Sequence, residues 1–483
     1  IRHLRRSHDL IFDLLLGYGV TLPVGGRLAR PLWLPVRFVC TLPRGAVCGA
    51  SVNLHSGTAR QAEAGGAETT RCALGMESAR ESPLLVARSL TQLLERDTVR
   101  VELIPEKKGL FLKHVEYQVT SQRFKISVYR RYTDFDVLHE VLLHRFPYRA
   151  VPALPPKRKL KGVLTSEREF IEGRRRALRR FINTVARHPF FSEDELVKTF
   201  LTFNGSDVQC KLREAYKKTG DEFMTNKIST QAKDFLPTDV QGQFASSREL
   251  IRNTFSSFHK LRGRVERVCE RSRETSADLQ VFGKELSTMG SGTSSVPSPA
   301  GGHCSWGTIQ QSLKGLSGEF ALLADKAAEQ GRREEDEVVE KLNLFLDVLQ
   351  SYKDLCERHE KGILQDQQRA QQRHSVMRRQ TISSGPQARE QPTVEQLESR
   401  IVQQENAIQA MELRSYFSLF CLHQETQLVF AYLQLAPLVL EALVGSQILG
   451  HREMGELWNN LQPKMSRLLG YSNSVSSPPF TSQ

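Results

Sequence analysis

The chain has few cysteines, and their spacing builds neither a redox pair nor a metal site. Its 483 residues include eight cysteines, which are scattered and form no Cys-x-x-Cys pair. This usage predicts free thiols in a reducing compartment rather than a disulfide scaffold. The nearest grouping is Cys40, Cys48, His55 and Cys72, which lacks the spacing of zinc ligands. We therefore expect no metal and no cofactor.

Long hydrophobic runs and catalytic motifs are missing as well. Hydrophobic residues make up 39% of the chain, and no uninterrupted apolar run approaches the roughly 18 residues of a membrane-spanning helix. His139 and His144 are five residues apart, so they do not share the helix face that a zincin site needs. No Gly-x-Ser-x-Gly sequence and no phosphate-binding loop of the GxxxxGK[ST] type occurs. The sequence predicts a protein that is not an enzyme and that meets membranes only from their surface.

Charge of one sign is in excess. Lysine and arginine outnumber aspartate and glutamate by 67 to 54, which gives a net charge of +13 at pH 7. A basic surplus of this size favours a polyanionic partner, either nucleic acid or an anionic membrane.

The two ends of the chain differ from its middle. The sequence starts at Ile1, continues with a stretch rich in glycine, alanine and arginine to about residue 75, and offers Met76 as a plausible natural start. An apolar run at 10–16 loosely imitates a signal peptide, but Asp13 interrupts it. We expect residues 1–85 to be a disordered or atypical N-terminal extension and residues 471–483 to be a disordered tail.

Residues 98–130 have the alternation that is typical of β-strands. Three short runs alternate apolar and polar side chains, which predicts a three-stranded antiparallel meander. The chain then becomes helical from Asp134 to Phe146. A loop with four prolines covers 147–163, and two further helices are expected at 169–186 and 189–203.

From about residue 232 the hydrophobic period is that of long helices. The clearest seam steps by four and three residues and resumes after a polar interval; it consists of Ile309, Leu313, Leu316, Phe320, Leu323, Ala327, Val338, Leu342, Phe345, Leu349, Tyr352 and Cys356. A first helix should end before the loop at 290–299, and a third should begin at the capping box of Thr393 and Gln396 and kink at Pro437. Three such helices predict an elongated antiparallel coiled coil, which usually dimerises to cover its apolar flank.

Two nearby segments carry the groups that a phosphorylated inositol needs. Residues 130–135 read Arg-Arg-Tyr-Thr-Asp-Phe, and residues 151–157 read Val-Pro-Ala-Leu-Pro-Pro-Lys. An arginine at a strand end offers a bidentate fork for a phosphate, the tyrosine offers an apolar floor, and the lysine adds a second charge. Taken alone, the arginine pair also fits an ordinary strand surface, and the proline loop fits an SH3 ligand or a linker.

Together the two segments resemble the PX domain, whose usual ligand is phosphatidylinositol 3-phosphate. The resemblance implies that Arg131 grips the 3-phosphate, that Tyr132 packs on the inositol ring, and that Lys157 contacts the 1-phosphate. In that family the arginine after Phe-Ile-Glu-x bonds the 4- and 5-hydroxyls. Residues 170–174 read Phe-Ile-Glu-Gly-Arg, so the resemblance gives this role to Arg174.

Further basic residues lie outside these four. The arginine run at 174–180 fits contact with anionic lipid and a solvated helix face equally well. Lysines and apolar residues alternate around 211–227, which indicates an amphipathic helix that inserts into a bilayer. Residues 373–379 fit either a lipid contact at the tip of a coiled coil or a solvated helix end, and Thr381 follows them in the pattern of a basophilic kinase site. The accessory membrane contacts predicted from these patterns are Arg130, Lys211, Lys217, Lys218, Arg373, Arg378 and Arg379.

The long helices that follow the PX-like unit resemble the BAR domain of the sorting nexins. The chain is thus similar to the sorting nexins that carry PX and BAR domains. The expected fold is an α+β PX domain at 95–205, with a three-stranded antiparallel sheet plus helices. A linker follows at 206–231, and an all-α elongated three-helix coiled-coil BAR domain at 232–470 that dimerises.

This resemblance implies a peripheral membrane protein on the cytosolic face of early endosomes, in sorting and in early-endosome-to-Golgi retrograde transport. Its expected partners are phosphatidylinositol 3-phosphate, the anionic membrane surface, a second copy of the chain, and cargo or coat proteins. Two alternatives stay open: a coiled-coil scaffold that recruits protein partners, and a basic nucleic-acid-binding protein. Residues 157–180 hold ten lysines and arginines, but no zinc-finger or RNA-binding motif accompanies them, so no nucleic acid is expected.

Overall fold

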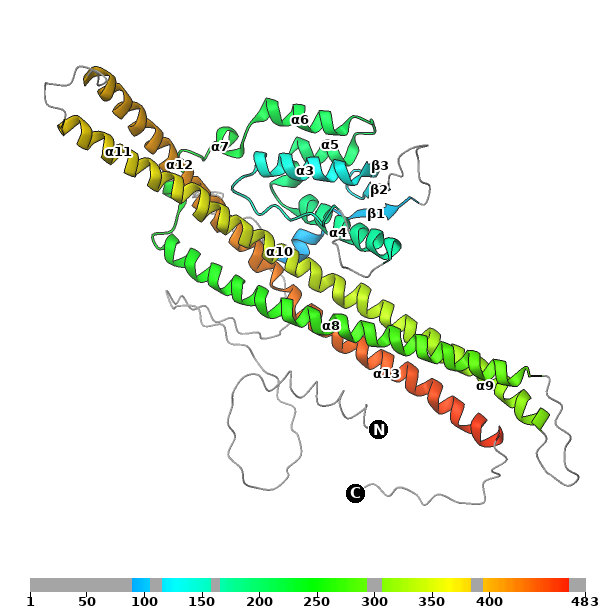
Figure 1. Cartoon of the computed structure of the whole chain (residues 1–483). Coiled ribbons are helices and arrows are strands. Elements are labelled where there is room, and N and C mark those ends of the chain that lie inside the picture. Colours follow the sequence, from blue (N-terminus) through cyan, green and yellow to red (C-terminus); the bar gives the residue numbers. More distant parts are fainter. Residues whose placement is uncertain (1–88, 105–114, 158–165, 293–305, 384–393, 469–483) are drawn as a thin grey trace, which may run out of the picture. The chain divides into compact units, whose positions relative to one another are not determined.

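A computed structural model describes residues 89–104, 115–157, 166–292, 306–383 and 394–468 (Figure 1). All of these residues belong to one compact unit, Glu77–Gln483. The expectations for residues 1–85 and 471–483 lie outside the described residues.

The predicted meander is present. Strands β1 (Val99–Leu103), β2 (Glu116–Ser121) and β3 (Ile126–Arg131) form an antiparallel sheet in the order β1-β2-β3. Val119 faces Val101 on one side and Val128 on the other, and these three valines are fully buried. The same register places Glu116 opposite Arg131, which becomes important for the site.

Helices cover the buried face of this sheet. They are α3 (Tyr132–Arg145), α4 (Glu167–Arg187) and α5 (Glu195–Thr202), with a 3-10 turn η1 (Phe191–Glu193) before α5. Helix α6 (Val208–Thr219) packs on α3 and α5. Ser166 and Glu169 form a reciprocal capping box at the start of α4. Phe135 lies at the centre of the core, with edge-on ring contacts to Tyr117, Phe181 and Phe200.

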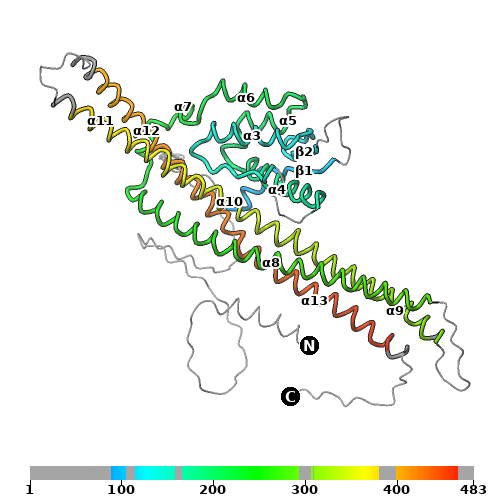
Figure 2. Tube along the Cα trace, in the orientation of Figure 1, coloured from blue at the N-terminus to red at the C-terminus, as the bar shows by residue number. Residues whose placement is uncertain are grey.

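The long helices follow as the heptad pattern predicts. After α7 (Glu222–Thr225) and the 3-10 turn η2 (Ala232–Phe235), α8 (Val240–Gly290) runs for 51 residues, which is about 75 Å at 1.5 Å per residue. The second long helix is α9 (Trp306–Arg333), α10 (Glu340–Arg358) and α11 (Gln365–Ser383). Between them lie two π-helical segments, η3 (Glu334–Val339) and η4 (His359–Leu364). In Figure 2, the α9 and α10 parts of this path lie beside α8, and α11 extends beyond it.

The apolar seam of the second long helix forms the core of the long-helix domain. Nine of its predicted members are buried: Leu316, Leu323, Ala327, Val338, Leu342, Phe345, Leu349, Tyr352 and Cys356. The prediction that they form the packed side of a coiled coil is therefore confirmed.

The third helix breaks near the predicted proline. It consists of α12 (Val394–Tyr432) and α13 (Leu435–Leu468), with a turn at Leu433 and Gln434 between them. Pro437 lies in the first turn of α13, where its missing N–H is tolerated. Its ring would clash with the carbonyl of Leu433 in a continuous helix, which explains why the break precedes the proline by a few residues.

Candidate phosphoinositide site and the contacts around it

Arg131 lies at the N-cap of α3, at the end of β3, with about half of its side chain exposed. Its Nε is 3.0 Å and its Nη2 is 2.9 Å from Oε1 of Glu116, the residue opposite it across the sheet. The backbone N–H of Arg131 donates to Asp134 at 2.7 Å. The strand, the cap and the Glu116 carboxylate together hold the guanidinium by its Nε–Nη2 edge, and no hydrogen bond or ion pair from Nη1 is present among the described residues.

The other three predicted ligand residues are brought together. Tyr132 donates from its hydroxyl to the carbonyl of Pro155 at 2.6 Å, which ties the start of α3 to the proline loop. Arg174 donates from Nη2 to the carbonyl of Lys157 at 2.8 Å, and its guanidinium carbon lies 5.2 Å from the centroid of the Tyr132 ring. Lys157 is exposed and lies 3.3 Å from Asp136. Tyr132 and Arg174 therefore contact the proline loop, and Lys157 lies at its end. Arg131 precedes Tyr132 in the chain and so lies next to this group.

Two polar atoms close to the Tyr132 ring are buried without a hydrogen bond of normal geometry among the described residues. They are the hydroxyl of Tyr117 and Nε of Arg174. Burial raises the pKa of Tyr117, and the neighbouring positive charge of Arg174 opposes this shift.

Arg130 does not have the predicted role. It is 1% exposed and donates from Nε and Nη2 to the carbonyl of Phe200, at 3.0 and 2.7 Å. Burial lowers the pKa of Arg130 to about 10. It secures α5 to the sheet, so the prediction that it contacts the membrane is wrong.

The amphipathic helix is present as α6, but its apolar face is occupied. Val208 and Leu212 are buried in the core of the sheet domain, and Tyr216 packs against that core. The prediction that this face inserts into a bilayer is wrong in this conformation, and α6 completes the sheet domain instead of acting as a linker. Lys211, Lys217 and Lys218 remain exposed on its other side.

The basic residues at the end of α11 are exposed as expected. Arg373, Arg378 and Arg379 lie there, and α12 runs back beside this helix. The side chain of Thr381 lies outside the described residues.

A buried ionic cluster, which sequence analysis missed, joins the sheet domain to the long helices. Arg149, fully buried, donates to Glu222 at 2.6 Å and lies 3.3 Å from Glu425 of α12. His188 lies 3.1 Å from both oxygens of Glu425. Burial raises the pKa of Glu425, but His188 and Arg149 outweigh it, so its pKa lies below the usual range.

A short helix before the sheet, α2 (Leu90–Leu94), packs into the same junction. Ser89 caps it by accepting from the backbone N–H of Gln92 at 3.3 Å. Leu90 and Leu93 are buried in a cluster that includes Val348 of α10 and Tyr432 of α12. Sequence analysis missed α2 because a five-residue helix is too short to have a recognisable period.

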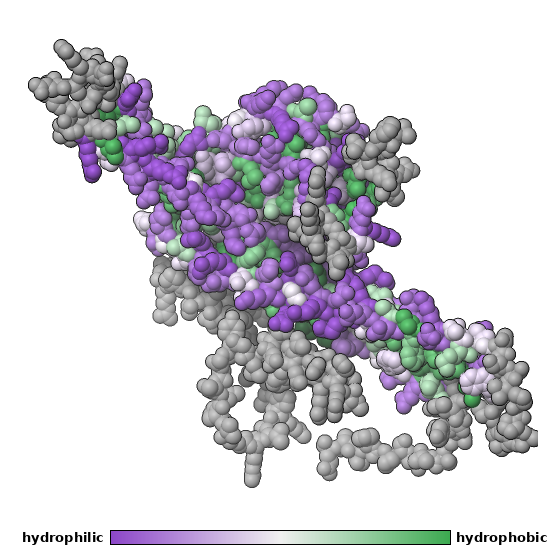
Figure 3. Space-filling view, in the orientation of Figure 1, coloured by the Kyte–Doolittle hydropathy of each residue, from purple (hydrophilic) through white to green (hydrophobic). Residues whose placement is uncertain are grey.

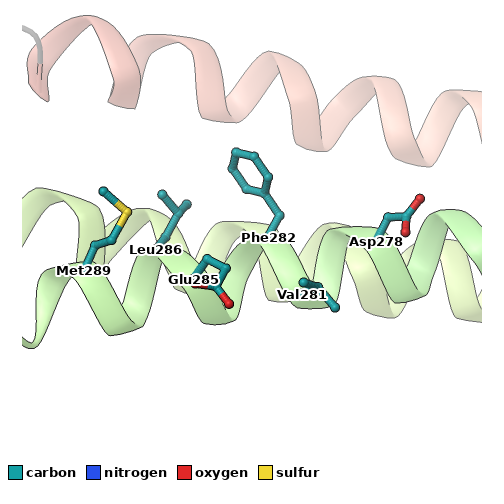
Figure 4. Close-up of a pocket in the computed structure, with 6 residues that line it drawn as sticks. All are labelled: Asp278, Val281, Phe282, Glu285, Leu286 and Met289. Atoms are coloured by element: carbon teal, nitrogen blue, oxygen red, sulfur yellow. The ribbon is translucent and has the colours of Figure 1, made fainter.

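Large apolar side chains remain exposed along α8, α9 and α13. They are Leu250, Val281, Phe282, Met289, Trp306, Leu322, Leu438, Leu440, Val444, Ile448, Leu449 and Trp458. A shallow pocket in α8 is lined by Phe282, Leu286 and Met289, which point to the side on which α13 runs (Figure 4). In the space-filling view, hydrophobic residues gather where α8 and α9 meet (Figure 3).

Part of this apolar surface lies in a stretch with the composition of a membrane span. Within the helical stretch Ser399–Met465, an 18-residue window reaches a mean hydropathy of 1.8, and 33% of that window is buried. Polar residues divide this stretch, so it contains no long uninterrupted apolar run. The helices of this stretch also contain the buried Glu425 and Ser418, which are typical of a helix packed against protein.

Family comparisons agree with this architecture. A PX domain model matches residues 118–204, and a model described as the sorting nexin 8/Mvp1 BAR domain matches residues 218–466. The chain is 64% identical to sorting nexin-8 of Mus musculus over 409 residues, which cover 84% of this chain and 88% of that protein. It is 63% identical to sorting nexin-8 of Homo sapiens, covering 84% and 86%.

A solved structure has the same fold. The cryo-EM structure of the SNX-BAR Mvp1 tetramer superposes with a TM-score of 0.56 at 22% identity, covering 77% of this chain and all of that one. The chain belongs to the sorting nexins, a family of peripheral membrane trafficking proteins, and within it to those that join a PX domain to a BAR domain of the sorting nexin 8/Mvp1 type.

Proposed function

We propose that this sorting nexin binds phosphatidylinositol 3-phosphate through Arg131, Tyr132, Lys157 and Arg174, and acts as a non-enzymatic adaptor on membranes. The observation that carries the proposal is the convergence of Tyr132, Lys157 and Arg174 around the proline loop, with Arg131 next to them at a rigid strand end. Arg131 offers its Nη1 side to the 3-phosphate, where a bidentate contact is strongest. Arg174 serves the ring hydroxyls, and Lys157 serves the 1-phosphate.

The apolar surface of α8, α9 and α13 supports a second part of the proposal, a homodimer through the BAR domain. Leu440, Val444 and Ile448 are spaced by four residues, so they form one exposed stripe along α13. Exposed apolar patches of this extent mark interaction surfaces. A second copy covers the stripe, and the dimer presents two lipid pockets on one body, which multiplies their effect by avidity.

The proposed setting follows from the family. The dimer senses or induces curvature on the cytosolic face of early endosomes and serves early-endosome-to-Golgi retrograde transport, with cargo or coat proteins as further partners. The exposed cations Lys211, Lys217, Lys218, Arg373, Arg378 and Arg379 add attraction to anionic lipid, at about 1 kcal/mol for each charge near the surface.

The test is co-sedimentation of the full chain with vesicles that contain phosphatidylinositol 3-phosphate, at fixed salt and vesicle diameter. Arg131→Ala should lose selective binding to these vesicles. Arg213→Ala is the matched control, because Arg213 is an equally exposed arginine of the same domain, paired with Glu140 on α3. Equal binding by wild type and Arg131→Ala would overturn the pocket. In that case a coiled-coil scaffold that recruits proteins would be the better description.

A further inference from the structure

Helix α4 carries two sets of arginines on different faces. Arg174 points to the inositol pocket, where it contacts the carbonyl of Lys157. Arg176 and Arg180 are four residues apart and share another face, because side chains at i and i+4 lie one above the other. Arg174 and Arg176 are two residues apart, so they lie on nearly opposite sides of the helix.

The second face meets an acidic segment of the BAR domain. Arg180 donates from Nε to Asp347 at 2.7 Å and from Nη1 to both oxygens of Glu340, at 2.9 and 3.1 Å. Arg179 donates to Glu340 at 3.4 Å. Arg176 donates to Glu335 and lies 3.7 Å from Asp336. These pairs join residues about 160 positions apart in the chain. They are therefore tertiary contacts between α4 and the BAR helix, and not pairs within one helix.

The Arg180–Glu340 pair is shielded from water, so it outweighs an ordinary surface ion pair, whereas Arg179, Asp336 and Asp347 are more exposed. The side chains of Arg180 and Glu340 are only 15% and 10% exposed. Burial lowers the pKa of Arg180, but Asp347 and Glu340 outweigh burial, and the pKa lies above its usual value. Arg180 therefore keeps its positive charge at neutral pH and pairs with both carboxylates.

We propose that Arg176, Arg179 and Arg180 form an internal docking surface whose partner is the acidic segment 335–347 of the same chain. This docking surface fixes the orientation of the phosphoinositide pocket relative to the BAR helices. Arg176, Arg179 and Arg180 thus form neither a lipid contact nor a solvated face. The functional part of this inference rests on the proposed lipid binding, whereas the docking itself does not.

The first test is independent of lipid. In the full chain, Arg180→Gln and Glu340→Gln are measured singly and together, by urea unfolding and by hydrogen exchange of the amides in α4 and α10. Docking predicts that each single variant loses protection in both helices and that the double variant loses less than the sum. Fully additive effects, or loss of protection in α4 alone, would overturn the docking surface. Neither a positive nor a negative result of this test bears on lipid binding by the pocket.

The second test separates docking from lipid contact. Vesicles of phosphatidylcholine and phosphatidylserine with phosphatidylinositol 3-phosphate are compared with soluble inositol 1,3-bisphosphate as probes. Docking predicts that Arg180→Gln and the pair Glu340→Gln with Asp347→Asn both weaken vesicle binding, by about threefold to tenfold, because two misaligned pockets lose avidity. Affinity for the soluble headgroup should not change.

Three results overturn the proposal. If the arginines contact lipid, removing the acidic partners frees them, and the Glu340→Gln, Asp347→Asn variant binds vesicles more tightly while Arg180→Gln binds less tightly. If the face is merely solvated, neither variant changes vesicle binding. If the soluble headgroup also binds less tightly, the arginines act on the pocket itself. A failure of the proposed function would appear separately, as unchanged binding by Arg131→Ala.

Discussion

Arg149 donates from Nη2 to Oε1 of Glu222 at 2.6 Å, and both side chains are almost completely removed from water. Glu425 completes the cluster from α12, and the guanidinium carbon of Arg149 lies 3.6 Å from the centroid of the Phe190 ring. Arg149 therefore holds three parts of the chain together. They are its own loop in the PX domain, the connection that contains Glu222, and the third BAR helix, which contains Glu425. Removing that cation leaves the buried carboxylate of Glu222 without its ion-pair partner and leaves Glu425 with His188.

We predict that Arg149→Met lowers the free energy of unfolding by about 3–5 kcal/mol, because breaking a buried pair leaves uncompensated charge. Urea unfolding of the full chain, followed by circular dichroism, measures the change. Arg213→Met is the control, since Arg213 and Glu140 form an ion pair in which both side chains are about half exposed. A loss no larger than that of the control would mean that the cluster does not stabilise the junction.

The same cluster shows where the sequence could and could not predict the structure. The alternation of apolar and polar residues and the heptad spacing are patterns among residues a few positions apart. These patterns predicted the meander, the long helices and the buried seam. Arg149 and Glu425 are 276 positions apart, and no local period marks them as partners. Arg130 was misassigned for a related reason, because its position in the motif does not reveal that Phe200 and Phe203 supply carbonyls that bury it.

The residues of the candidate site are easier to recognise in the sequence than those of the junction. A phosphate pocket needs particular residue types in fixed loops, and that requirement is visible in the sequence as the arginine pair and the proline loop. The carboxylates that hold these cations were not predicted. Nothing in the sequence marks Glu116 or Asp136 as part of the site. The sheet register places Glu116 beside Arg131, and the start of α3 places Asp136 beside Lys157.

Glu116 gives a prediction about the pocket. Its carboxylate holds Arg131 by Nε and Nη2, so it leaves the Nη1 side for a phosphate. Glu116→Ala should weaken binding to phosphatidylinositol 3-phosphate several-fold, because the guanidinium loses its fixed orientation. Binding to vesicles with phosphatidylserine alone should stay equal or increase, because a negative charge is removed.

Vesicle co-sedimentation with both lipid compositions checks this pair of effects. Glu193→Ala is the control, since Glu193 pairs with Arg123 away from the pocket. Stronger binding to both vesicle types would show that Glu116 only repels lipid and does not orient Arg131. The effect of Glu116→Ala should also disappear in an Arg131→Ala background.

The exposed stripe on α13 predicts the oligomeric state. Val444→Asp and Ile448→Asp each place a charge at the centre of the stripe, where burial against a second copy would desolvate it. Sedimentation equilibrium at micromolar concentration should give a dimer for wild type and a shift of at least tenfold in the dissociation constant for either variant, which corresponds to about 1.4 kcal/mol. Val376→Asp is the control, because Val376 is equally exposed but lies on α11. A monomeric wild type would rule out the dimer.

His359 predicts how stability depends on pH. It is 1% exposed, its Nδ1 lies 2.8 Å from the hydroxyl of Ser418, and burial lowers its pKa to about 4. The unfolded chain gains this proton near pH 6.5, well before the folded chain does. The stabilisation from the neutral ring is therefore complete above about pH 6.5 and decreases as the pH falls towards 4, by up to about 3 kcal/mol. Urea unfolding between pH 7.5 and 4.5 should show a steeper loss for wild type than for His359→Gln. The exposed control His144→Gln should follow wild type, and parallel curves for all three proteins would contradict the assignment of this loss to His359.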